Sequence, residues 1–267
     1  MANLLSRQTS KIAAAGARCQ DLRRLVSRNS LRQSAPAHLR PQPAMRPIAP
    51  LLILALLSTP AAAQMVEARG GDVYFRPGCD LPARRLTASG SDSQPRLSPD
   101  GRLVVFVREA RRDSVETAQG RVPASSIWIV RTGGGGLRKL VEARSDTAPE
   151  RALAAFQAPQ FSPDGRRIYF LSSAWATSGA VHFVDVASGA RRFLVPGNSL
   201  EVATTGRYAG HLLVEQHRYF VAGGSYDWLW LFTPLGREVG PVAESEAAAE
   251  EFRATFLRRP GAECPAD

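Results

Sequence analysis

A short string that occurs twice constrains the fold of this chain more than any other feature. Ser98-Pro99-Asp100-Gly101-Arg102-Leu103 recurs as Ser162-Pro163-Asp164-Gly165-Arg166-Arg167, and a degenerate copy follows as Ala203-Thr204-Thr205-Gly206-Arg207. The glycines are 64 and then 41 residues apart. The second spacing lies in the range of about 40–45 residues that is typical of one propeller blade. Polar insertions at residues 109–125 and 143–155 account for the longer first spacing.

The repeated string has the chemistry of a turn between two strands. Serine at the first position, proline at the second and glycine at the fourth are the preferences of a type I turn, which also explains Asp100 and Asp164 without a catalytic role. Each turn precedes an apolar run, at residues 103–107 and 168–171, and two further runs joined by a glycine turn complete each unit. Four short strands per unit are the make-up of a propeller blade.

The remaining segments extend this pattern at both ends. Residues 72–75 and 84–87 are predicted to be the last two strands of an earlier unit, and a further unit occupies residues 200–239. Residues 245–258 are rich in Ala and Glu and favour a helix with Ser245 as N-cap, although a strand near residues 252–257 is the alternative. The sequence therefore predicts an all-β, propeller-like array of about four four-stranded units, with a possible short C-terminal helix.

The Ser-Pro-Asp-Gly turn before a β-run, with a later Gly turn and an Arg-Lys-Leu type of ending, resembles the TolB-type, WD40-like β-propeller repeat over residues 72–242. The resemblance implies a periplasmic propeller that contacts other proteins. TolB itself has an α/β domain before six blades, whereas here about 30 residues precede the first repeat and about four blades follow, which leaves a Tol–Pal role open. The same repeat precedes the hydrolase domain of prolyl-oligopeptidase-like enzymes, and a fold alone does not fix a function.

Residues 45–63 have the layout of a secretory signal peptide. One arginine, an apolar run at residues 51–57 and three alanines predict cleavage between Ala63 and Gln64. The run is shorter than the roughly 20 residues of a membrane span, although an uncleaved anchor is the alternative. Residues 1–44 are interpreted as a start codon assigned too far upstream or a disordered leader, with a transit peptide as the alternative. Residues 64–267 then form one periplasmic or secreted bacterial domain.

The charge of the chain is concentrated in its leader. Nine of the 34 Lys/Arg and one of the 24 Asp/Glu lie in residues 1–63, so residues 64–267 hold 25 and 23 and carry a net +2. A nearly neutral domain has no strong electrostatic case for binding nucleic acid. The domain also contains an even pair of cysteines, Cys79 and Cys264, which in an oxidising compartment predicts a disulfide bond.

The sequence contains weak candidates for a metal site and none for catalysis. His211, Glu215 and His217 share the parity of one strand face and are metal-ligating residue types, although a polar strand face is the simpler interpretation. The string at residues 223–227 lacks the final glycine of a serine-hydrolase nucleophile elbow. Aromatic residues alternate at Tyr226, Trp228, Trp230 and Phe232, which favours core packing over a binding platform.

These observations favour an exported, non-enzymatic module that needs no cofactor. It would bind an unidentified envelope protein or peptide, or serve as a scaffold, and would have no stable membrane insertion after processing. The alternative is an enzyme or metal-binding protein that uses the central channel of the propeller.

Overall fold

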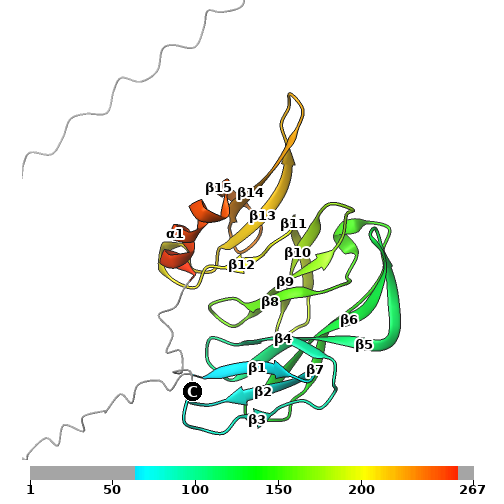
Figure 1. The fold of residues 1–267 in the computed structure, drawn as a ribbon, viewed down its shortest axis with the longest axis vertical. Helices are drawn as coiled ribbons and strands as arrows, with labels where there is room; N and C mark the ends of the chain where they lie inside the picture. Colours follow the sequence, from blue (N-terminus) through cyan, green and yellow to red (C-terminus); the bar gives the residue numbers. More distant parts are fainter. Residues whose placement is uncertain (1–63, 258–267) are drawn as a thin grey trace, which may run out of the picture. The chain divides into compact units, whose positions relative to one another are not determined.

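The strands form four antiparallel sheets that follow one another along the chain (Figure 1). The computed structural model describes residues 64–257, so the predicted leader and signal peptide, with Ala63, and the predicted disulfide partner Cys264 lie outside the described residues. In chain order the elements are β1 (Met65–Arg69), β2 (Asp72–Arg76), β3 (Arg84–Arg85), β4 (Asp92–Leu97), β5 (Leu103–Thr117), β6 (Gly120–Arg131), β7 (Arg138–Glu142), η1 (Pro149–Arg151), β8 (Gln157–Phe161), β9 (Arg167–Ser173), β10 (Gly179–Asp185), β11 (Arg191–Pro196), β12 (Glu201–Val202), η2 (Gly206–Tyr208), β13 (Leu212–Tyr219), β14 (Ser225–Phe232), β15 (Glu238–Ala243) and α1 (Glu246–Phe256).

Three of the sheets have four strands, and within each sheet every strand pairs with its neighbour in sequence. The predicted all-β array with a C-terminal helix is confirmed. The first sheet differs from the expected four strands because it has three, β1, β2 and β3. The sequence predicted two strands in this sheet, at residues 72–75 and 84–87, and did not predict β1. A tight turn at Gly70 and Gly71 joins β1 to β2.

Consecutive sheets pack face to face because their middle strands are apolar on both sides. In β9, Ile168 and Phe170 enter a cluster shared with the second sheet, whereas Tyr169 and Leu171 enter a cluster shared with the fourth. Side chains alternate between the two faces of a strand, so a strand buried on both faces is a continuous apolar run. The same arrangement in β5 sends Val104 toward the first sheet and Val105 toward the third.

Helix α1 covers the last sheet of the series. Its buried residue Ala249 packs with Leu213, Leu229 and Ala243 of the fourth sheet, and Figure 1 shows α1 beside β15. Ser245 is the N-cap, as predicted, and its hydroxyl accepts a hydrogen bond from the Ala248 N–H. The alternative of a strand near residues 252–257 is wrong, because this segment forms the last turns of α1.

The first strands of the four sheets, β1, β4, β8 and β12, contact one another in that order. Two glutamines help to join them. The Gln94 side-chain oxygen accepts a 2.8 Å hydrogen bond from the Ala158 N–H, and Gln160 bonds the backbone of Leu200 and Val202 on the next sheet. These bonds connect the first strands of neighbouring sheets beside the apolar cluster that contains Leu200 and Val202.

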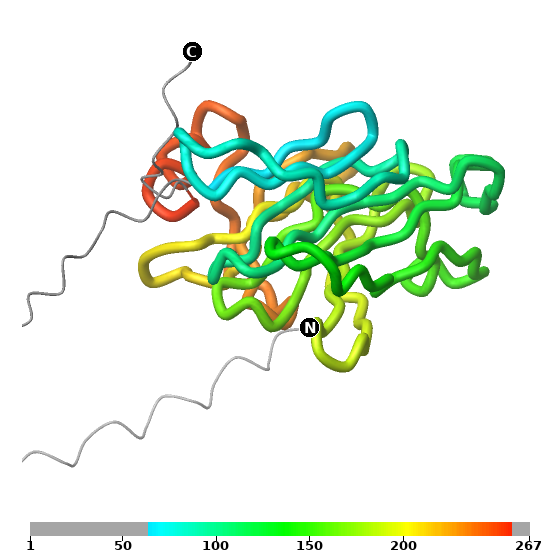
Figure 2. Tube along the Cα trace, turned by 90° about the horizontal axis from the view of Figure 1, so that it is seen from below, coloured from blue at the N-terminus to red at the C-terminus, as the bar shows by residue number. Residues whose placement is uncertain are grey.

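The two polar insertions have different structures. Residues 109–125 continue β5 and β6 as a long hairpin, in which Gln119 near the tip donates to the backbone of Trp175 and Ala176. This hairpin lies at the right-hand side of both views (Figure 1, Figure 2). The second insertion contains η1 and an isolated bridge between Arg144 and Leu153.

Candidate functional site

The repeated Ser-Pro-Asp-Gly strings form two hydrogen-bonded turns of the same design. The Ser98 hydroxyl donates to the Asp100 carboxylate at 2.6 Å and accepts from the Leu103 N–H at 2.9 Å, and Gly101, at φ +70°, donates to the Ser98 carbonyl. The serine hydroxyl is the main reason that the pKa of Asp100 lies below its usual range. This carboxylate is therefore occupied within its own turn.

The second copy repeats these contacts. The Ser162 hydroxyl donates to Asp164 at 2.5 Å and accepts from the Arg167 N–H, and the pKa of Asp164 is lowered for the same reason. Gly165 has the same positive φ as its counterpart, a conformation that glycine adopts without steric cost. Both carboxylates hold turns, which gives them no free position for acid–base chemistry.

The three weak metal candidates have separate neighbours. The His211 ring bonds the Tyr208 carbonyl through Nδ1, and the His217 Nδ1 lies 2.8 Å from the Asp227 carboxylate. His211 directly precedes β13, and a rise of about 3.3 Å per residue along the extended chain puts roughly 13 Å between the Cα atoms of His211 and Glu215. Among residues 64–257, no group of three or more His, Cys, Asp or Glu side chains is placed to hold a metal ion.

The alternating aromatic residues of β14 divide into two pairs. Trp230 and Phe232 are buried in the cluster between the third and fourth sheets, while Tyr226 and Trp228 are half-buried at its margin. The difference follows from the neighbouring strands. The residues of β14 before Leu229 do not pair with β15. The residues of β13 after Leu213 do not pair with β12.

The hairpin of β13 and β14 therefore continues past its sheet as a two-stranded arm. The arm comprises residues 216–228 and projects from the fourth sheet in Figure 1. An isolated two-stranded hairpin is marginally stable at best in water. Here side-chain contacts hold it. His217 pairs with Asp227 across the two strands, and Phe220, Tyr226 and Trp228 form an aromatic row with ring centroids separated by 4.6 and 4.7 Å.

The tip of the arm is a tight turn. The Gly223 N–H donates to the Phe220 carbonyl and the Phe220 N–H donates to the Gly224 carbonyl, both at 3.0 Å. Gly223 and Gly224 have φ values of +99° and +87°, which other residues rarely adopt. This closure leaves Val221 and Ala222 at the outermost positions of the hairpin.

Three consecutive apolar side chains are exposed at this tip. Tyr219 is 71% exposed, Phe220 is 52% exposed, and Val221 is fully exposed, with a relative exposure of 110%. Scattered exposed apolar residues need no explanation, but a contiguous group on a projecting element is typical of an interaction site. The sequence reading did not find this group. The signal was present as Tyr219-Phe220-Val221, followed after Ala222 by the glycine pair Gly223-Gly224, which marks a turn with an apolar tip.

No helix in the described part of the chain is long and apolar enough to cross a membrane.

No protein-family model matches this sequence, and no curated protein matches it either. Solved structures with a similar fold include TolB from Acinetobacter baumannii, at 16% identity and a TM-score of 0.45 over 66% of this chain and 38% of that one. The putative TolB from Agrobacterium tumefaciens has 13% identity and a TM-score of 0.46 over 68% and 58%. Dipeptidyl peptidase 4 from Porphyromonas gingivalis has 9% identity and a TM-score of 0.47 over 68% and 31%.

The chain is thus structurally similar to TolB β-propellers and to other β-propellers at low sequence identity. It spans less than two thirds of the length of each of these three proteins. They include a peptidase as well as TolB, so the likeness is one of fold and does not separate a binding protein from an enzyme.

Proposed function

We propose that this protein is a non-enzymatic binding module, exported to the bacterial periplasm or beyond, whose β13–β14 arm docks into an apolar groove on a partner protein. The exposure of Tyr219, Phe220 and Val221 at the tip of a braced hairpin carries the proposal. Ordering costs weaken association when a loop must be fixed on binding. An arm that is already held by its aromatic row and by the His217–Asp227 pair avoids much of that cost.

The charges of the arm favour a protein over a lipid surface. Peripheral elements that dock on anionic membranes combine apolar residues with clustered Lys and Arg. Residues 219–226 of the arm contain no Lys and no Arg. The arginine at the base of the arm, Arg218, is paired with Glu238 at 2.6 Å. Aromatic side chains without surrounding cationic charge are instead typical anchors at protein–protein interfaces.

Site-specific photo-crosslinking tests this proposal. A photoreactive phenylalanine analogue is placed at Phe220 in the full chain, which is produced in a bacterial host with an intact envelope. Leu235 is the matched control because it is a half-exposed apolar residue on a different turn of the same sheet. We expect a protein adduct from position 220 that position 235 does not form. The adduct should disappear when Val221→Asp is introduced, because a charge would be buried in the groove.

The captured protein is then purified and titrated against the unmodified chain and the Val221→Asp variant. We expect the variant to bind at least about tenfold more weakly, which corresponds to about 1.4 kcal/mol. Equal affinity for both chains, or adducts that are identical at positions 220 and 235, would contradict the proposal. Crosslinking of position 220 to phospholipid vesicles would contradict a protein partner and indicate a lipid surface. Crosslinking to a second copy of the chain would indicate self-association instead.

A further inference from the structure

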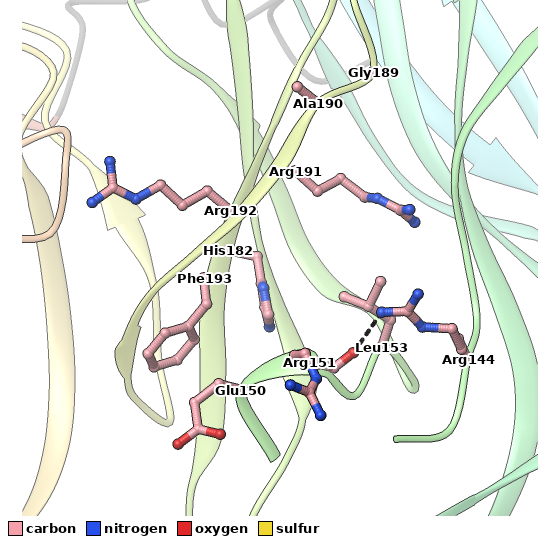
Figure 3. A pocket seen from close by; sticks show the side chains of 10 residues that line it. All are labelled: Arg144, Glu150, Arg151, Leu153, His182, Gly189, Ala190, Arg191, Arg192 and Phe193. Carbon is pink, nitrogen blue, oxygen red and sulfur yellow. Dashed lines mark hydrogen bonds between the residues drawn. The ribbon is translucent and has the colours of Figure 1, made fainter. Parts of the chain in front are cut away.

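A second feature of the surface, remote in sequence from the arm, is a pocket of about 400 Å³ beside the third sheet. It lies between the connection that follows β7 and the strands β10 and β11 (Figure 3). Its apolar lining includes Leu153, Ala190 and Phe193. Its polar lining contains four arginines and one acid, which are Arg144, Arg151, Arg191, Arg192 and Glu150.

His182 is the buried polar group of this pocket. Its side chain is 2% exposed, and its ring is stacked on Phe170 and meets the edge of Phe193, with centroids 5.5 and 5.6 Å away. Its Nε2 atom has no hydrogen-bond partner within residues 64–257. Figure 3 shows the ring pointing from β10 toward Arg151. A buried nitrogen left without a partner is unfavourable, and a ligand acceptor in the pocket would provide that partner.

The imidazole of His182 is neutral at pH 7. Burial, with a further contribution from Arg191, lowers the pKa of His182 to about 4. A neutral ring carries one N–H, and in one of its two tautomers that N–H is on Nε2. His182 can therefore offer a hydrogen-bond donor to an acceptor without adding a charge to the site.

The arginines make the pocket a local concentration of positive charge on a nearly neutral domain. Arg151 pairs with Asp146 at 3.1 Å, but Arg191 and Arg192 have no ion pair among the described residues. In Figure 3 the Arg191 guanidinium extends toward Arg144, while that of Arg192 extends the opposite way. Clefts lined by one sign of charge raise the local concentration of ligands of the opposite sign.

We propose that this pocket binds a small organic anion, in which a carboxylate or phosphate group faces Arg191 and the His182 Nε2 and an apolar body rests on Leu153 and Phe193. The planar guanidinium matches either oxyanion through two parallel hydrogen bonds. The volume is within the range of about 300–1,000 Å³ for small-molecule sites, which are mainly apolar with a few convergent polar groups. A bare inorganic ion would leave the apolar lining without a partner.

Calorimetric titration of the purified exported protein tests the site with four probes: benzoate, phenyl phosphate, uncharged benzamide and inorganic phosphate. We expect one or both of the organic anions to bind, and benzamide and inorganic phosphate to bind at least about tenfold more weakly. Preference for benzoate identifies the natural group as a carboxylate, and preference for phenyl phosphate identifies a phosphate ester. Failure of both organic anions to bind, or equal binding of benzamide, overturns the proposal.

Two variants and a matched control locate the binding. Arg191→Gln removes an exposed cation, and His182→Phe retains the ring between Phe170 and Phe193 but removes its nitrogen atoms. Each should weaken anion binding about tenfold. Arg121→Gln makes the same change of charge on an exposed arginine of β6 and should leave binding unchanged. Equal loss in Arg191→Gln and Arg121→Gln would show general charge attraction and refute the site, and Arg191→Gln keeps the test decisive if His182→Phe does not fold.

Discussion

Arg218 lies over the indole ring of Trp230, with its Cζ atom 3.5 Å from the ring centroid. The same guanidinium donates to the Glu238 carboxylate at 2.6 Å. One side chain of β13 therefore joins β14 and β15 at the level where the arm leaves the sheet. The arm is consequently a continuation of the fourth sheet with a fixed base, and its apolar tip is presented by that base rather than by a flexible loop.

Replacing Arg218 with Met should loosen this base. The variant keeps an unbranched apolar side chain but loses the cation–π contact and the ion pair, and we expect the free energy of unfolding to fall by about 1–2 kcal/mol. Urea denaturation followed by tryptophan fluorescence measures the change. Arg237→Met is the control because Arg237 is exposed on the adjacent turn, and it should remain within about 0.5 kcal/mol of the unmodified protein. Equal stability of both variants would contradict the role given to Arg218.

The turns and the stacked sheets were predictable because their causes are local in sequence. Ser98 and Asp100 bond within their own turn, and the continuous apolar runs predict strands buried on both faces. The arm was not predicted, because its extent depends on where β12 and β15 stop pairing with its strands. The pocket around His182 was also beyond sequence reasoning. It depends on a connection from the second sheet folding against the third.

The degenerate third copy of the repeat also depends on a contact that is distant in sequence. Thr204 and Thr205 stand where the other copies have Pro and Asp, and both donate their N–H groups to the Phe256 carbonyl at the end of α1. The last carbonyls of a helix lack partners within the helix, so these threonines satisfy one of them. The loss of the turn motif is thus explained by a contact about 50 residues away in the chain, which no local pattern displays.

Substituting Ala249 tests the packing of α1. Ala249 is fully buried against Leu213 and Leu229, so Ala249→Arg forces a long charged side chain into the cluster. We expect a loss of about 3 kcal/mol or more in the free energy of unfolding. Ala247→Arg, at an exposed position of the same helix, should change it by less than about 0.5 kcal/mol. Similar stability of the two variants in thermal unfolding would mean that the helix does not cover the fourth sheet.

His182 should make the stability depend on pH. Its pKa is lowered from 6.5 to about 4, mainly by burial, so between these values the unfolded chain binds more protons than the folded one. The free energy of unfolding should therefore be highest above about pH 6.5 and should fall as the pH drops toward 4, by up to about 3 kcal/mol in total. Urea denaturation at a series of pH values measures this loss.

His182→Phe separates this effect from the titration of other groups. The variant has no ring nitrogen to protonate, so its stability should fall less than that of the unmodified protein between pH 6.5 and 4.5. The carboxylates of the two turns, Asp100 and Asp164, have lowered pKa values and contribute mainly below this window. Parallel pH profiles for the two proteins would refute the assignment to His182.

Export should leave Gln64 as the first residue of the mature protein. The three alanines before it provide the small side chains that signal peptidase requires. Sequencing the N-terminus of protein recovered from the envelope fraction measures the cleavage point. A chain that begins at Met1 in that fraction would contradict the predicted signal peptide, and would also weaken the case for an oxidising compartment.

The predicted Cys79–Cys264 disulfide can be tested in the exported protein. Cys79 is partly buried in the connection between β2 and β3, and Cys264 follows the end of α1 by eight residues. The bond would close a loop of about 185 residues, which the chain-entropy model values at about 4–5 kcal/mol less any native strain.

Three measurements on the exported protein test this disulfide. Thiol titration should find no free thiol in residues 64–267, and mass spectrometry without reduction should find a single linked peptide pair. The Cys264→Ser variant should have a lower melting temperature than the unmodified chain. Two titratable thiols in the mature protein, or a Cys264→Ser variant as stable as the unmodified chain, would show that the tail is not fastened to the first sheet.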